Sequence, residues 1–223
     1  MSKENGYSMQ AVPAFSNLNN CPIFSMTSTQ TQVGTVGDES CNILVIGDQS
    51  GNISLWSIHN DAIFGCGPAP KDSFSRVGVV KGGQGKHSIT TTKIIQKNIL
   101  VSGNTNGDIR FWDIESVQKP RLSLRQDHCG AHSGSVEACM SVGDVLLTSG
   151  GNDGKLVGWD ISTCNEIGGL SCHPGRKTLV RDTRSRRTMK CCVIGFILPA
   201  KREGRLVTLC RDGVLAYWAF DVP

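Results

Sequence analysis

A short segment that ends in a tryptophan occurs four times in this chain. The clearest copy, residues 144–161, reads Asp-Val-Leu-Leu-Thr-Ser-Gly-Gly-Asn-Asp-Gly-Lys-Leu-Val-Gly-Trp-Asp-Ile. An apolar, β-rich run is followed by Asn152-Asp153-Gly154, and a second β-rich run then reaches Trp159. Asp-Gly accepts the positive φ angles of a type I′ turn, whose twist suits antiparallel strands. The segment therefore predicts a β-hairpin.

The other three copies keep the same internal spacing. They are residues 42–58, 98–114 and 205–221, with the turn pairs Ser50-Gly51, Asn106-Gly107 and Asp212-Gly213 and the tryptophans Trp56, Trp112 and Trp218. In every copy the turn glycine precedes the tryptophan by five positions (51 to 56, 107 to 112, 154 to 159, 213 to 218). All 4 tryptophans of the chain are used in this way, which indicates a repeat protein.

Composition supports an all-β globular fold. The 223 residues can bury a sizeable core, and 26 glycines with few helix signals suit many tight turns. No apolar run approaches the length of a membrane span, and the residues after Met1 lack a signal-peptide pattern. We therefore expect a cytoplasmic or nuclear protein. The 10 cysteines are scattered without a C-x-x-C pair, so reduced structural thiols are favoured over a zinc site, and no cofactor is expected.

Further strand candidates flank each hairpin, so that each unit supplies about four strands. The candidates are residues 21–26, 77–80, 89–95, 120–124, 135–141, 166–170 and 191–198. The units are approximately 20–81, 82–125, 126–171 and 172–221, after an N-terminal segment 1–19. Tryptophan-to-tryptophan intervals of 56, 47 and 59 residues (56 to 112, 112 to 159, 159 to 218) are close to, or longer than, the roughly 40–45 residues of a propeller blade.

These features together resemble the WD-repeat β-propeller family. The resemblance depends on Trp112-Asp113, Trp159-Asp160, the Asp-Gly and Asn-Gly turns, and His87 and His132, which stand 25 and 27 positions ahead of their tryptophans. It covers residues 20–221, although the first and last units depart from the pattern with Trp56-Ser57 and Trp218-Ala219. The expected fold is all-β, a WD-repeat β-propeller with four recognisable blades.

The resemblance implies a buried hydrogen-bond network in each complete blade. The third unit has the full set in His132, Ser149, Asp153 and Trp159, and the second keeps His87, Ser102 and Trp112 but has Asn106 in place of the aspartate. A buried aspartate needs donors, which an imidazole and a hydroxyl supply. The same residue types occur in hydrolase triads, but a nucleophile is needed once and this set is repeated, so we expect no catalytic residues. Residues 82–87 lack the first glycine and the Ser/Thr of a phosphate-binding loop.

Residues just ahead of the turns are candidates for contact with a partner. By resemblance, Gln49, Thr105, Asn152 and Arg211 should lie near one rim and contact a protein or peptide; the alternative is that they only shape their turns. The function implied is a non-enzymatic scaffold for protein–protein interactions within a multiprotein complex. The partner's identity is not encoded in the fold.

A basic segment interrupts the fourth unit. Between residues 171 and 205 there are ten Lys/Arg against two acidic residues, and the insertion at 174–190 carries Arg176, Lys177, Arg181, Arg184, Arg186 and Arg187. Because charge runs are usually solvated, a plain surface insertion is the favoured interpretation. The alternative is a module that contacts RNA or an anionic membrane through residues 176–205.

Four units leave two ways to complete the structure. Either the blades form a small closed ring, with residues 7–15 supplying one closing strand beside 215–220, or they form a partial ring that a partner or a second copy completes. The partial ring is favoured because the terminal units resemble ordinary blades of a longer array. An open arc would expose strand edges and promote self-association.

Overall fold

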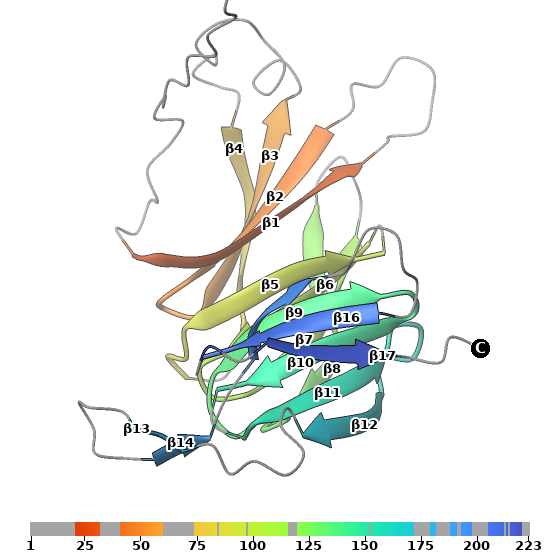
Figure 1. The fold of residues 1–223 in the computed structure, drawn as a ribbon. Helices are drawn as coiled ribbons and strands as arrows, with labels where there is room; N and C mark the ends of the chain where they lie inside the picture. The colour runs from red at the N-terminus through yellow and green to blue at the C-terminus, as the bar shows by residue number, and fades with distance from the viewer. Residues whose placement is uncertain are drawn as a thin grey trace, which may run out of the picture.

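The computed structural model describes residues 21–31, 41–59, 74–83, 85–96, 98–115, 120–151, 153–171, 179–181, 188–190, 193–197, 205–211, 213 and 215–219. These residues form strands and turns without a helix, which confirms the all-β prediction (Figure 1). The described residues accordingly contain no helix long and apolar enough to cross a membrane.

The described strands form four antiparallel blade sheets, each built from strands in chain order, and one separate two-stranded sheet. The first blade contains β1 (Ile23–Thr31), β2 (Cys41–Asp48), β3 (Asn52–His59) and β4 (Phe74–Lys81). The second contains β5 (Ile89–Ile95), β6 (Ile99–Asn104), β7 (Ile109–Glu115) and β8 (Arg121–His128). The third contains β9 (Val136–Val142), β10 (Val145–Gly150), β11 (Lys155–Asp160) and β12 (Glu166–Ser171).

The fourth blade has three strands among the described residues. They are β15 (Val193–Ile197), β16 (Arg205–Cys210) and β17 (Leu215–Ala219). A separate hairpin of β13 (Leu179–Arg181) and β14 (Thr188–Lys190) lies in the basic insertion. The approximate boundary expected between units two and three, at residues 125 and 126, falls within β8, which continues to His128. The proposed closing strand at residues 7–15 lies outside the described residues.

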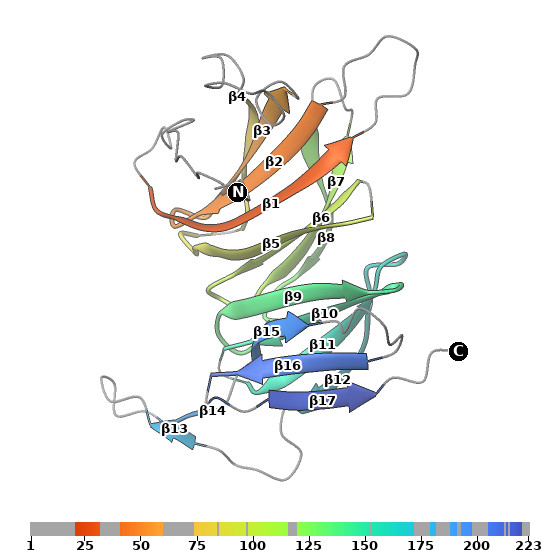
Figure 2. The same ribbon diagram turned by 45° about the horizontal axis from the view of Figure 1, so that its top comes forward.

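The blades are arranged as an open arc. The first strands of successive blades, β1, β5, β9 and β15, neighbour one another along its inner side. The first and fourth blades lie at opposite ends of the molecule (Figures 1 and 2). The described strands thus form four blades that follow one another without closing into a ring.

Every repeat has the same strand register. Each tryptophan lies opposite a leucine of the preceding strand, in the pairs Leu44–Trp56, Leu100–Trp112, Leu146–Trp159 and Leu206–Trp218. The turn glycines Gly51, Gly107, Gly154 and Gly213 all have positive φ, between 62° and 87°, as the hairpin prediction requires. The repeated sequence spacing is therefore a repeated three-dimensional register.

The hydrophobic core lies between blades, because both faces of each internal sheet are covered by a neighbour. Trp112 packs against Val45 and Leu55 of the first blade, and Trp159 against Phe111 of the second. Trp218 packs in turn against a cluster that contains Leu156 of the third blade. Each of these tryptophans thus faces the preceding blade. Leu55 and Phe111, just before Trp56 and Trp112, point to the following blade, since strand side chains alternate.

Hydrogen-bond network and candidate interaction rim

The indole of each tryptophan donates a hydrogen bond within its own blade. Trp112 Nε1 donates to Ser102 Oγ over 2.8 Å, Trp159 Nε1 to Thr148 Oγ1 over 2.8 Å, and Trp218 Nε1 to Thr208 Oγ1 over 2.9 Å. The three hydroxyls occupy equivalent positions, two residues after the leucine that faces the tryptophan. Burying an indole N–H without an acceptor would be costly, so the hydroxyl accompanies the tryptophan.

The first blade has no hydroxyl at this position. Ile46 occupies it, and Trp56 Nε1 donates instead to Ser54 Oγ over 3.2 Å. The first unit also has Ser50 in the sequence where the network would have its aspartate.

The third blade extends the pair into a four-residue chain. His132 Nδ1 lies 2.8 Å from Asp153 Oδ2, and His132 Nε2 lies 2.8 Å from Thr148 Oγ1. With the imidazole proton on Nδ1, the Thr148 hydroxyl donates to Nε2 and its oxygen accepts the proton of Trp159. Every donor in the chain then has an acceptor, as a buried polar network requires.

Thr148, and not the expected Ser149, provides the hydroxyl of this chain. Ser149 lies on the opposite face of β10, where its Oγ donates to the carbonyl of Val193 in the fourth blade over 2.7 Å. Sequence spacing selected Ser149 because it lies ten positions before Trp159, just as Ser102 lies ten positions before Trp112. The turn of the third blade is one residue longer, because Ser149 pairs with Leu156 whereas Gly103 pairs with Ile109. Strand alternation on its own could have shown that the hydroxyl must share a face with Leu146.

The carboxylate of Asp153 organises the turn as well as the histidine. It accepts hydrogen bonds from the backbone N–H of Ser133 over 3.1 Å and of Lys155 over 2.9 Å. Burial favours the neutral acid, but the hydrogen bonds from His132 and the two backbone groups outweigh it, and the pKa of Asp153 lies below its ordinary value. The aspartate is therefore held as an anion that joins the start of the blade to its hairpin turn.

In the second blade the buried acid is Asp108, which does not occupy the position equivalent to Asp153 of the third blade. Among the described residues, no hydrogen bond connects the half-buried ring of His87 with Ser102 or Trp112. Asp108 instead accepts from Asn104 Nδ2 over 2.8 Å and from the Gly130 N–H over 2.9 Å. Burial again opposes ionisation, and these hydrogen bonds with nearby Arg110 lower the pKa of Asp108. Sequence reasoning missed Asp108 because it lies after the turn glycine rather than before it.

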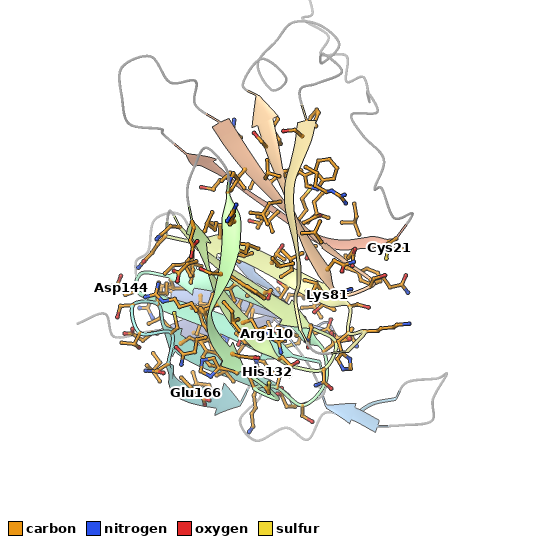
Figure 3. The ribbon with its side chains drawn as sticks, turned by 180° about the vertical axis from the view of Figure 1, so that it is seen from behind. Cys21, Lys81, Arg110, His132, Asp144 and Glu166 are labelled. Carbon is orange, nitrogen blue, oxygen red and sulfur yellow. The ribbon has the colours of Figure 1, made fainter. Side chains whose placement is uncertain are left out.

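Arg110, labelled in Figure 3, is a buried cation that was also missed. Its Nη1 donates over 2.6 Å to the carbonyl of Gly82, the residue that follows β4 of the first blade. The guanidinium also lies 3.1 Å from Asp127 and 3.6 Å from Asp108. An arginine on a strand flanked by apolar residues was the available sequence signal, since a buried guanidinium needs several acceptors. Arg110 thus links the first two blades.

The hairpin turns contact the start of the next blade. The Gly107 carbonyl accepts a hydrogen bond from the backbone N–H of His132 over 3.0 Å. A Cβ on Gly107 would collide with the His132 carbonyl oxygen, and a Cβ on Gly51 would lie 2.6 Å from the His87 carbonyl oxygen. The repeated histidines therefore also mark where the backbone of one blade touches the turn of the preceding blade.

The predicted rim residues are positioned by equivalent backbone hydrogen bonds. The N–H of Gln49 donates to Pro22 over 2.9 Å, and the N–H of Thr105 donates to Ser88 over 3.0 Å. Both bonds join the turn after the second strand to the residue ahead of the first strand, and both Gln49 and Thr105 are exposed. In the third blade Gly151 makes this bond, to Ser135 over 2.6 Å. The longer turn has again shifted the position by one residue, from Asn152 to Gly151.

The fourth rim residue reaches toward a neighbouring blade. Exposed Arg211 places Nη2 3.2 Å from Glu137 Oε2, on the inner strand of the third blade. Ser88 Oγ likewise donates to the Gln49 carbonyl across the first junction over 2.9 Å. Polar contacts on this rim thus cross the first and the third blade junctions.

Comparisons with known proteins bear on the fold. No protein-family model and no curated protein matches the chain. Among solved structures, it is similar to Chaetomium thermophilum Sqt1 bound to the N-terminus of the ribosomal protein L10, with a TM-score of 0.58 and 20% sequence identity. The fold is that of a WD-repeat-like β-propeller. The similarity covers 88% of this chain and 43% of the Sqt1 chain, so the present propeller spans less than half the length of that protein.

Several predicted residues of the propeller lie where the structure does not describe them. These are Asn152 of the rim and Arg176, Lys177, Arg184, Arg186 and Arg187 of the basic insertion. Arg181 lies in β13, and its side chain is not described. Among the described residues, no group of three or more His, Cys, Asp or Glu side chains could hold a metal ion.

Proposed function

We propose that this propeller is a non-enzymatic scaffold that binds a peptide or an extended segment of a partner protein along the rim that contains Gln49, Thr105, Gly151 and Arg211. The observation that carries the proposal is the repeated backbone hydrogen bond at Gln49, Thr105 and Gly151. It fixes the backbone of equivalent positions in three successive blades on one rigid edge, where the side chains of Gln49 and Thr105 are exposed. Binding residues commonly occupy loops that a rigid scaffold positions in this way.

The buried network supports a structural role over a catalytic one. Thr148 and Ser149 are both fully buried, and His132 is 2% exposed. The Thr148 hydroxyl is engaged by both Trp159 and His132, and the Ser149 hydroxyl by the Val193 carbonyl. A nucleophile must reach a substrate atom, and neither hydroxyl is accessible to one.

The solved neighbour supports the class of partner. Sqt1 was determined with the N-terminus of a ribosomal protein bound. We infer from the shared fold that a short protein segment is a suitable ligand for the present chain. The solved structures with significant similarity comprise 602 chains, so the fold by itself does not select one partner.

Selection from a displayed peptide library on the immobilised protein tests this function. The selected peptides are then measured against a rim variant, Gln49→Ala with Thr105→Ala and Arg211→Ala. A matched control is Leu124→Ser, an exposed position on the outer strand β8. We expect the rim variant to weaken binding at least about tenfold, or about 1.4 kcal/mol, with the control unchanged. Peptides that bind both variants as tightly as the wild type would contradict the proposed rim.

We further propose that the basic insertion contacts a polyanion such as RNA or an anionic membrane. Figures 1 and 2 draw β13 and β14 as a hairpin separate from the four blades. Binding of a single-stranded RNA and of vesicles with anionic lipid should fall with rising salt, and should be lost in Arg184→Ala with Arg186→Ala and Arg187→Ala. Unchanged binding in that variant would exclude the insertion as the polyanion-binding site.

We also propose self-association through an open end of the arc.

A further inference from the structure

Exposed lysines flank the rim at the junction of the first two blades. Lys81 ends β4 beside the first-blade turn, because the N–H of the residue after it donates to the Gly51 carbonyl over 2.8 Å. Lys86 stands two residues ahead of Ser88, which is hydrogen-bonded to the rim positions of both the first and the second blade. Both lysines are exposed, so their ammonium groups are available at this part of the rim.

Two more cations lie on the rim of the third and fourth blades. Exposed Lys155 begins β11 directly after the third-blade turn. Exposed Arg211 follows β16 and reaches Glu137, which lies beside the third rim position, since a Cβ on Gly151 would come within 2.7 Å of Glu137 Oε1. The rim cations are defined here as Lys81, Lys86, Lys155 and Arg211.

The carboxylates at the same end of the blades are already engaged within the fold. Neighbouring amide, imidazole or guanidinium groups hold Asp48, Asp108, Asp127 and Asp153. Glu137 is paired with Arg211 over 3.2 Å. Among the described residues, no carboxylate forms an ion pair with Lys81, Lys86 or Lys155. Three of the rim cations therefore carry positive charge that the fold does not use.

The basic insertion leaves and rejoins the blades at this rim. β12 ends at Ser171, which lies opposite Lys155, and β15 begins at Val193, which lies opposite the last residue of β16. Figure 2 shows the β13–β14 hairpin on the side at which β1 and β9 begin and β16 ends. In the sequence, residues 172–192 contain seven basic residues and one acidic residue. The connection thus adds positive charge at the end of the blades that carries the rim cations.

The opposite end of the blades has a different charge balance. Among the described residues it carries five acidic and three basic side chains: Asp113, Glu115, Asp144, Asp160 and Glu166, with Arg121, Arg125 and Arg205. An uneven distribution of this kind steers charged ligands toward the end of opposite sign. A negatively charged ligand is therefore directed to the rim.

We propose that the segment bound at the rim is acidic, a stretch of protein rich in Asp and Glu whose carboxylates pair with the rim cations. This inference rests on the proposed rim function and names the chemistry of its partner. Complementary charge of this kind favours the correct partner and speeds its association. RNA fits the surface less well, because the sequence has no Phe, Tyr or Trp between residues 171 and 195 on which a base could stack.

The peptides selected from the displayed library on the wild-type chain give the first readout. We expect them to contain more Asp and Glu, and less Lys and Arg, than the unselected library. The affinity of a selected acidic peptide, measured by fluorescence anisotropy, should fall as salt rises. The variant Lys81→Gln with Lys86→Gln and Lys155→Gln should bind it about tenfold more weakly. The matched control is Arg121→Gln, an exposed arginine at the opposite end, which should leave the affinity unchanged.

Glu137→Gln separates an effect of charge from one of structure. It releases Arg211 from its ion pair and removes a carboxylate that competes with those of the ligand. The affinity for the acidic peptide should therefore rise, by about two- to fivefold. A loss of affinity in Glu137→Gln, or an unchanged affinity in the triple lysine variant, would overturn the inference.

The remaining outcomes distinguish this inference from the rim function on which it rests. Selected peptides that are neutral or basic, yet lose affinity in the Gln49/Thr105/Arg211 variant, would overturn the acidic assignment and leave the rim function standing. Single-stranded RNA or anionic vesicles that bind through the three lysines, where acidic peptides do not, would also overturn it. Peptides that bind the Gln49/Thr105/Arg211 variant as tightly as the wild type would contradict the rim function and this inference with it.

Discussion

Replacing Thr148 by valine tests the assignment of the hydroxyl that supports Trp159. The substitution keeps the side-chain shape but removes two hydrogen bonds of 2.8 Å, one with Trp159 and one with His132. All three residues are at most 2% exposed, so water cannot replace the lost partner. Each buried polar group left unsatisfied costs about 1–3 kcal/mol, so we expect the free energy of unfolding to fall by about 2–5 kcal/mol.

The comparison variant is Ser149→Ala, at the neighbouring position that sequence spacing favours. It removes one hydrogen bond, to the Val193 carbonyl, and should cost about 0.5–1.5 kcal/mol. Thr148→Ser keeps the hydroxyl and loses one methyl group, for about 1 kcal/mol. Urea unfolding followed by far-UV circular dichroism measures all three. A larger loss for Ser149→Ala than for Thr148→Val would refute the assignment of Thr148.

Three further substitutions test other features of the fold. Gly107→Ala should lower the free energy of unfolding by about 3 kcal/mol or more, because the new Cβ collides with the next blade and the backbone is left-handed. Gly213→Ala should cost only the backbone strain, about 1 kcal/mol, because no atom lies near its Cβ position. Thermal unfolding measures both variants. Arg110→Met leaves the buried carboxylate of Asp108 uncompensated and should cost about 3–5 kcal/mol. The exposed ion pair lost in Arg125→Met should cost less than about 1 kcal/mol, and similar losses in the two variants would contradict the buried role of Arg110. The folded-state pKa of Asp153 is lowered, so its ionisation stabilises the protein above about pH 4 and the benefit disappears as pH falls through the folded value. The stability difference between wild type and Asp153→Asn should therefore shrink below about pH 4 in urea titrations, and a difference that grows on acidification would contradict this sign.

The repeat itself was predictable because a local pattern encodes it. A glycine five positions before each tryptophan fixes both a hairpin turn and a strand register, and the four observed hairpins follow it. Blade boundaries were less well determined. Residues 121–128 form one strand, but Arg125 and Gln126 lack an apolar alternation that would show its end.

Identifying the site residues required knowledge of strand faces that spacing cannot supply. One additional residue in the turn between Ser149 and Leu156 displaced both the hydroxyl and the rim position in the third blade. The Arg110 interactions were hidden for a different reason. Its acceptors Gly82 and Asp127 lie 28 and 17 positions away in sequence (82 to 110, 110 to 127). Pairing of β7 with β8 places Asp127 opposite Arg110, and packing of the second blade against the end of the first brings Gly82 to it.

The direction in which the tryptophans point has a consequence for synthesis of the chain. Trp112, Trp159 and Trp218 each pack on the blade that precedes them in sequence. When each of these strands leaves the ribosome, the surface that receives its indole has already been made. N-terminal parts of a chain fold first during translation, so each junction can form as soon as its third strand emerges. The array can therefore assemble vectorially, one blade at a time, without waiting for its C-terminal residues.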